Sequence, residues 1–168
     1  MTAERQEKYT WRPGIAFIAL LAGFLALPGP DWTARAATTE RLVVNRYSGL
    51  AIEGFDPVAY FTDERAVRGL PEYELSEAGA VWRFHNASNR AAFAAHPEIY
   101  GPKFGGYDPV DIARGVTAAG NPHFWVVTGR RLYLFALEQH RADFAANPQR
   151  YLPEAEARWP DLQKALAR

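Results

Sequence analysis

Two segments of the chain carry apolar runs on either side of a turn, which is the pattern of a β-hairpin. Residues 73–84 alternate apolar and polar positions around a turn at 77–80 and end in a second apolar run. Residues 124–135 repeat the pattern more strongly, with Phe-Trp-Val-Val and Leu-Tyr-Leu-Phe flanking the turn at 128–130. Because β-branched and aromatic residues favour strands, we predict one hairpin in each segment.

A helix is predicted after each hairpin. Asn86 or Ser88 can act as the N-cap of a helix that runs through Ala95, because their side chains accept hydrogen bonds from free backbone N–H groups. A second helix is predicted over residues 138–146, at the same distance from its hairpin.

A repeated pentapeptide precedes each hairpin. Gly54-Phe55-Asp56-Pro57-Val58 recurs as Gly106-Tyr107-Asp108-Pro109-Val110. An Asp-Pro pair suits a helix start, with Asp as the N-cap and Pro at the first helical position. We therefore predict two short helices, over 57–61 and 109–114, the second ending at Gly115.

The whole unit is duplicated, because equivalent residues recur at a nearly constant offset of about fifty positions. The pairs include Gly69 and Gly120, Pro71 and Pro122, Phe84 and Phe135, Phe93 and Phe144, Pro97 and Pro148, and Tyr100 and Tyr151. A single hairpin is marginal on its own, so we expect the two hairpins to join in one small antiparallel sheet packed by helices. The predicted fold class is α+β, built from two tandem β-hairpin-plus-helix repeats.

The domain layout follows from these boundaries. An extended arm over 37–53 leads into one domain, 54–160, that is made of the repeats 54–102 and 106–153. A short tail, 161–168, ends the chain in a small polar helix.

The first segment, residues 1–36, is predicted to be a secretory signal peptide. Arg5, Lys8 and Arg12 precede an apolar run over 15–27, and an Ala-Arg-Ala site of the small-x-small type ends at Ala36. The run is shorter than the about 20 residues that span a bilayer. We expect a periplasmic or secreted location, with an uncleaved membrane anchor facing the periplasm as the alternative.

Composition narrows the classes of partner. The formal net charge is +0, without a basic run, which argues against nucleic acid as a partner. The chain contains no cysteine, so disulfides, thiolate metal ligands and thiol catalysis are excluded together. No nucleophile elbow, phosphate-binding glycine loop or paired-carboxylate pattern indicates an enzyme.

An ordered set of motifs resembles the exported YHS-domain proteins, over about residues 45–159. The motifs are Phe55-Asp56-Pro57-Val58-Ala59-Tyr60-Phe61, Trp82-Arg83-Phe84 with Asn89-Arg90 and Phe93, Tyr100-Gly101-Pro102-Lys103-Phe104-Gly105-Gly106-Tyr107, and Leu132-Tyr133-Leu134. The resemblance implies a small α+β module, with binding of copper or another heavy metal expected of many members. This chain is a tandem, cysteine-free variant of that pattern.

The resemblance also implies where metal ligands would lie. The positions that carry cysteine in metal-binding relatives correspond here to Ala59, His85 and Asn89 in the first repeat, and to Asp111, Ala136 and His140 in the second. With every thiolate replaced, the candidate ligands are Asp111 and His140, with His85 or His123 completing the set. Imidazole and carboxylate suit Cu(II), Zn or Ni, whereas Cu(I) prefers thiolate or thioether.

Each candidate ligand also has a structural interpretation. Asp111 follows the N-cap Asp108 by three residues, where an acid stabilises a helix start. His140 fits an ordinary first helical turn, and His85 fits an exposed strand face.

Two functions therefore remain open. The first is an exported binding module for a metal ion or a small ligand. The second is a structural or protein-interaction accessory module whose metal site has decayed, attached to a protein partner. A membrane is expected as a partner only if the first segment is not cleaved.

Overall fold

The computed structural model describes residues 41–166. The predicted signal segment, residues 1–36, lies outside the described residues, as do 37–40 and 167–168. Between residues 41 and 166, no helix has the length and apolarity needed to cross a membrane.

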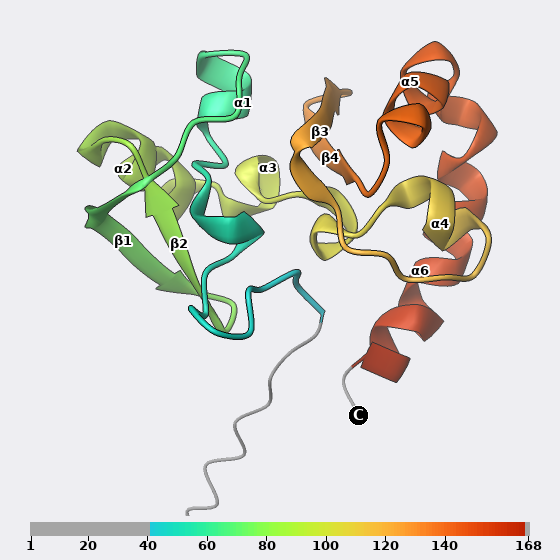
Figure 1. Cartoon of the computed structure of the whole chain (residues 1–168), viewed down its shortest axis with the longest axis horizontal. Helices are drawn as coiled ribbons and strands as arrows, with labels where there is room; N and C mark the ends of the chain where they lie inside the picture. The colour runs from blue at the N-terminus through green and yellow to red at the C-terminus, as the bar shows by residue number, and fades with distance from the viewer. Residues whose placement is uncertain (1–40, 167–168) are drawn as a thin grey trace, which may run out of the picture. The chain divides into compact units, whose positions relative to one another are not determined.

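The described chain is α+β, as predicted, and each repeat holds a short helix, a hairpin and a longer helix. In chain order the elements are η1 (Ile52–Gly54), α1 (Ala59–Thr62), β1 (Leu70–Glu77), β2 (Ala80–Phe84), α2 (Ala87–Ala95), α3 (Pro97–Tyr100), η2 (Lys103–Gly106), α4 (Pro109–Ala113), β3 (Asn121–Thr128), β4 (Arg131–Phe135), α5 (Glu138–Ala146), η3 (Pro148–Arg150) and α6 (Leu152–Leu166) (Figure 1).

The two hairpins form separate two-stranded antiparallel sheets, β1-β2 and β3-β4, rather than the single sheet that we expected. The reason lies at the outer edges of β2 and β4. Leu50 pairs in parallel with Val81 of β2, and Pro102 pairs in parallel with Leu132 of β4. The chain that precedes each hairpin therefore pairs with the free edge of that hairpin's second strand.

A left-handed turn precedes each Asp-Pro pair. Residues 52–54 and residues 104–106 all have positive φ angles, between 42° and 85°. A Cβ on Gly105 would overlap the carbonyl oxygen of Arg41, so this position needs glycine for space as well as for conformation. The first repeat has Glu53 at the equivalent place, in the same left-handed conformation. The structural repeat thus begins before the pentapeptide that revealed it.

Helix caps follow the predictions closely. Asn86 is the N-cap of α2 and accepts a hydrogen bond from the Asn89 backbone N–H at 2.8 Å. Asp108 is the N-cap of α4, and its side chain accepts from the Val110 N–H. In the first repeat the predicted start was wrong, because α1 begins at Ala59 with Val58 as its N-cap. The Asp56 side chain nevertheless accepts from the N–H groups of Val58 and Ala59.

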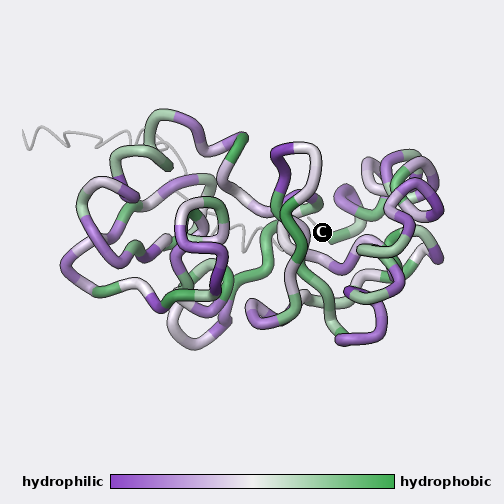
Figure 2. Tube along the Cα trace, turned by 90° about the horizontal axis from the view of Figure 1, so that it is seen from above, coloured by the Kyte–Doolittle hydropathy of each residue, from purple (hydrophilic) through white to green (hydrophobic). Residues whose placement is uncertain are grey.

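Two hydrophobic cores lie on opposite faces of β4. Leu132 and Leu134 pack into the core of the first repeat, whereas Tyr133 and Phe135 pack into the core of the second. Successive side chains of a strand point to opposite faces, so this single strand serves both cores. Hydrophobic stretches in the two strands of the β3-β4 hairpin accordingly lie near the middle of the view in Figure 2.

Helices α2 and α5, which follow the hairpins, each pack one buried phenylalanine against aromatic residues of the preceding hairpin. Phe93 of α2 contacts the rings of Trp82 and Phe84, and it is 1% exposed. Phe144 of α5 contacts the rings of Tyr133 and Phe135, and it is 0% exposed. The predicted equivalence of the two phenylalanines is confirmed.

The C-terminal helix is longer than the short polar helix that we predicted. Helix α6 has 15 residues and continues through Pro160. Its apolar side explains the length, because Ala155 is buried and the ring of Trp159 contacts Phe104 and Tyr107. Packing against the second core therefore stabilises a helix that sequence pattern alone did not indicate.

Candidate functional site

Asp108 is the centre of a buried hydrogen-bond network in the second repeat. Its side chain is fully buried and accepts from the Val110 N–H at 2.8 Å and the Ala136 N–H at 2.8 Å. Nδ1 of His140, in the first turn of α5, lies 2.7 Å from Asp108 Oδ2. One carboxylate thus joins the start of α4, the end of β4 and the start of α5.

Asp56 makes the equivalent network in the first repeat. Its fully buried carboxylate accepts from the N–H groups of Val58 and His85, each at 2.9 Å, and from Asn89 Nδ2 at 2.9 Å. Asn89 occupies the place that His140 occupies in the second repeat. His85 adds a ring contact, with Nδ1 2.6 Å from Asp56 Oδ2. Both repeats therefore need the buried aspartate for structure.

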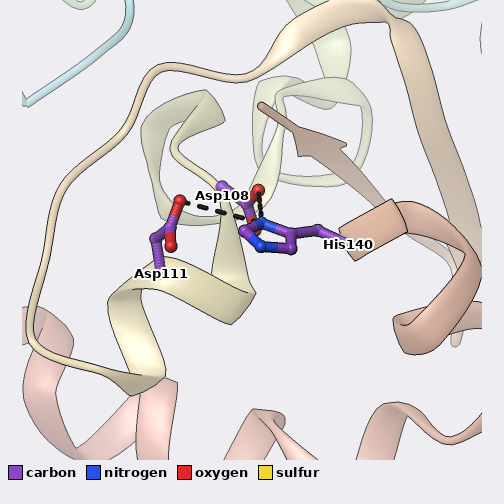
Figure 3. Close-up of side chains that lie close together, drawn as sticks. All are labelled: Asp108, Asp111 and His140. Atoms are coloured by element: carbon purple, nitrogen blue, oxygen red, sulfur yellow. Dashed lines mark hydrogen bonds and ion pairs between the residues drawn. The ribbon is translucent and has the colours of Figure 1, made fainter. Parts of the chain in front are cut away.

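The second repeat adds a further carboxylate to this network. Asp111, in the first turn of α4, places Oδ2 3.8 Å from Nδ1 of His140 (Figure 3). One ligand atom from each of Asp108, Asp111 and His140 lies within 4.8 Å of the other two. Among residues 41–166 this is the single group of three that could hold a metal ion. The equivalent of Asp111 in the first repeat is Ala59, which supplies no ligand.

Arg114 contacts both His140 and Asp111 in the second-repeat site. Its Nη1 lies 3.4 Å from His140 Nε2 and 3.6 Å from Asp111 Oδ1. A guanidinium can only donate hydrogen bonds, so His140 Nε2 acts as the acceptor and Nδ1 carries the proton that Asp108 accepts. The side chain of Arg114 is 60% exposed, which leaves it room to move away.

The structure brings together two of the four predicted ligands, Asp111 and His140. His85 belongs to the other network, where its Nε2 lies 2.7 Å from Asn86 Nδ2 and 3.7 Å from Asp63. His123 is exposed and packs its ring against Phe55 at 5.0 Å. Neither histidine is a member of the group of three.

Sequence reasoning did not include Asp108 among the ligands. We interpreted it first as a helix cap, and that interpretation is confirmed. The available signal was the spacing of Asp108 and Asp111, because residues three apart at a helix start lie on the same side of the first turn.

The donor set limits the metals that could bind. Two carboxylates and one imidazole suit Zn and Cu(II), and no thiolate is present to favour Cu(I). Three protein ligands on a tetrahedral ion would leave one position for water or another ligand.

Tyr60 of α1 connects the first repeat to the second. Its hydroxyl donates to the Pro122 carbonyl oxygen at 2.9 Å, and its ring packs against Trp125. Burial raises the pKa of the Tyr60 hydroxyl well above its ordinary value, and the nearby charges of Asp56 and Glu53 raise it further. Tyr60 is therefore a neutral structural donor at neutral pH.

A pocket of about 400 Å³ lies apart from the group of three. Residues of its lining include Leu42, Trp82, Phe93, Pro102 and Gln163. Its volume is in the range of small-molecule sites.

Comparison with known proteins adds no assignment. The chain gives no significant match to a protein family, a curated protein or a solved structure.

Proposed function

We propose that this chain is an exported, YHS-like binding module that holds a divalent metal ion at Asp108, Asp111 and His140. The observation that carries the proposal is the convergence of three ligand atoms within 4.8 Å in the second repeat. The motifs that resemble YHS proteins support it, because Asp111 and His140 stand where metal-binding relatives have cysteines. Zinc and Cu(II) are the ions that the donor set suits best.

The ion would lie beside Nδ1 of His140. This nitrogen faces both carboxylates, at 2.7 Å from Asp108 and 3.8 Å from Asp111 (Figure 3). Binding there requires the imidazole to give up its Nδ1 proton, because a metal ion needs a free lone pair. The ion would then occupy the place of the proton that now joins His140 to Asp108.

The first repeat supplies the variants that test this proposal. His140→Asn copies Asn89 and keeps a donor for the buried aspartate, while Asp111→Ala copies Ala59. Both changes remove a ligand and reproduce an arrangement that the same fold already tolerates. We expect each variant to stay folded and to bind zinc at least about tenfold more weakly than the wild type.

The measurement is titration calorimetry with zinc chloride, and separately with a Cu(II) salt, on the mature protein purified without an affinity tag. His85→Asn is the matched control, since His85 lies in the other network and its loss should leave zinc affinity unchanged. Binding weaker than about 0.1 mM in the wild type, or equal binding in His140→Asn, would overturn the proposal.

Export is tested separately by intact mass. We expect the exported protein to start at Ala37 or within a few residues of it. A full-length mass in the membrane fraction would show that residues 15–27 act as an anchor instead.

A structural or protein-interaction accessory module is the second candidate. Two observations favour it: the buried aspartate has the same structural contacts in both repeats, and Arg114 already compensates charge at the second site. If the titration finds no metal, this function is preferred, and a protein partner should then be sought by crosslinking in the periplasm.

A further inference from the structure

Arg114 contacts two of the three candidate ligands of the second-repeat site. It ends α4 as the C-cap residue, three positions after Asp111, and its guanidinium reaches across to α5. Its Nη1 contacts both a candidate ligand carboxylate, Asp111, and the far nitrogen of His140. The first repeat has Ala59 and Thr62 at the positions equivalent to Asp111 and Arg114, so it has neither the acid nor the guanidinium.

The two nitrogens of His140 cannot serve Arg114 and a metal ion at the same time. A neutral imidazole carries one proton, on either Nδ1 or Nε2. A metal ion on Nδ1 forces the proton onto Nε2, which then becomes a donor. Arg114 is also a donor, so the contact at Nε2 changes from a hydrogen bond to the opposition of two N–H groups.

We infer that Arg114 is an internal counter-cation of the site, which a metal ion must displace in order to bind. The inference rests on the proposed metal site and describes how that site is regulated. Displacement is sterically open, because the Arg114 side chain is 60% exposed and ends a short helix next to solvent.

The charges of the side chains at the site determine which class of metal ion can replace the Arg114 guanidinium. Asp108 and Asp111 together carry two negative charges, and Arg114 supplies one positive charge. A monovalent ion that replaced the guanidinium would leave the balance unchanged and would lose the hydrogen bond to His140. A divalent ion would neutralise both carboxylates, so the site favours divalent over monovalent ions.

The experiment compares zinc affinity in three variants of the mature protein by titration calorimetry. Arg114→Gln removes the charge, and its amide can accept from Nε2–H as well as donate to it. Arg114→Lys keeps a cation that can only donate. Arg130→Gln removes the same charge from the β3-β4 turn of the same repeat and controls for net charge.

We expect Arg114→Gln to bind zinc about tenfold or more tightly than the wild type. Arg114→Lys and Arg130→Gln should remain within about threefold of it. Nitrogen-15 NMR of His140 should show the proton on Nδ1 in the metal-free wild type and on Nε2 in zinc-loaded Arg114→Gln.

Three results would overturn the inference, and they are distinguishable. Equal zinc affinity in Arg114→Gln and the wild type would show that Arg114 does not compete, and the metal site itself would stand. Weaker binding in Arg114→Gln would show that the arginine helps to build the site. An absence of zinc binding in every variant would remove the proposed metal function together with this inference.

Discussion

Asn89 and His140 are structural equivalents: each donates from the first turn of a helix to a fully buried aspartate. Asn89 Nδ2 lies 2.9 Å from Asp56 Oδ2, and His140 Nδ1 lies 2.7 Å from Asp108 Oδ2. An amide in one repeat and an imidazole in the other therefore donate the equivalent hydrogen bond to the buried aspartate. Of the two groups, the imidazole is the one that suits zinc or Cu(II), so stability and metal binding can be tested separately at this position.

Replacing His140 by the residue of the other repeat should preserve stability. In His140→Asn the amide can still donate to Asp108, so the free energy of unfolding should stay within about 1 kcal/mol of the wild type. His140→Ala leaves Asp108 Oδ2 without that donor, at a cost of about 1–3 kcal/mol. Urea unfolding followed by circular dichroism measures both. Equal losses in the two variants would show that the amide does not substitute for the ring.

Phe93 and Phe144 should contribute similar amounts to the free energy of unfolding. Phe93→Ala and Phe144→Ala each remove a buried ring that packs on aromatic residues of its own hairpin, so each should cost about 3–5 kcal/mol. The same unfolding measurement applies, without metal. One near-neutral variant beside one that unfolds the protein would mean that the repeats are not packed alike.

Gly105 and Glu53 occupy equivalent positions in the two left-handed turns, but we expect substitutions there to change stability by different amounts. Gly105→Ala places a methyl group against the Arg41 carbonyl and should destabilise the fold by about 1–3 kcal/mol. Glu53→Gly relieves a positive φ of 56° and should change stability by less than about 1 kcal/mol. Thermal unfolding of both variants tests the pair. A harmless Gly105→Ala would show that the segment at Arg41 does not pack on this turn.

Alkaline unfolding should depend on Tyr60. Because burial raises the pKa of Tyr60 in the folded protein, folding favours the neutral hydroxyl. Its contribution to stability is present in full below about pH 10, the ordinary pKa of tyrosine, and is lost as the pH rises above that value. We therefore expect the wild type to lose stability more steeply above pH 10 than Tyr60→Phe does.

The control for this prediction is the comparison at neutral pH. There Tyr60→Phe should be less stable by about 1 kcal/mol, through loss of the hydrogen bond to the Pro122 carbonyl. The pKa of Tyr133 is also raised, mainly by burial, and this residue is unchanged in both proteins, so the difference between them isolates Tyr60. Parallel stability curves above pH 10 would contradict the assignment.

Much of the fold could be predicted from the sequence because it depends on interactions between residues that are close together in the chain. The hairpins follow from alternating runs around turns, and the caps Asn86 and Asp108 follow from hydrogen bonds within a few residues. The duplication follows from the repeated pentapeptide and from equivalent residues at a nearly constant offset. Each of these features is encoded within about fifty residues of chain, where sequence spacing and spatial distance still correspond.

The sequence by itself therefore determined the α+β class, the tandem repeat and the pairing of Phe93 with Phe144 as equivalent core positions. Tertiary structure alone decided that the hairpins form separate sheets and that Asp108 joins Asp111 and His140. It also decided that Arg114 reaches Nε2 of that histidine. These contacts depend on how whole elements pack, and a shift of a few ångströms in α5 would have placed His140 beyond reach of either carboxylate.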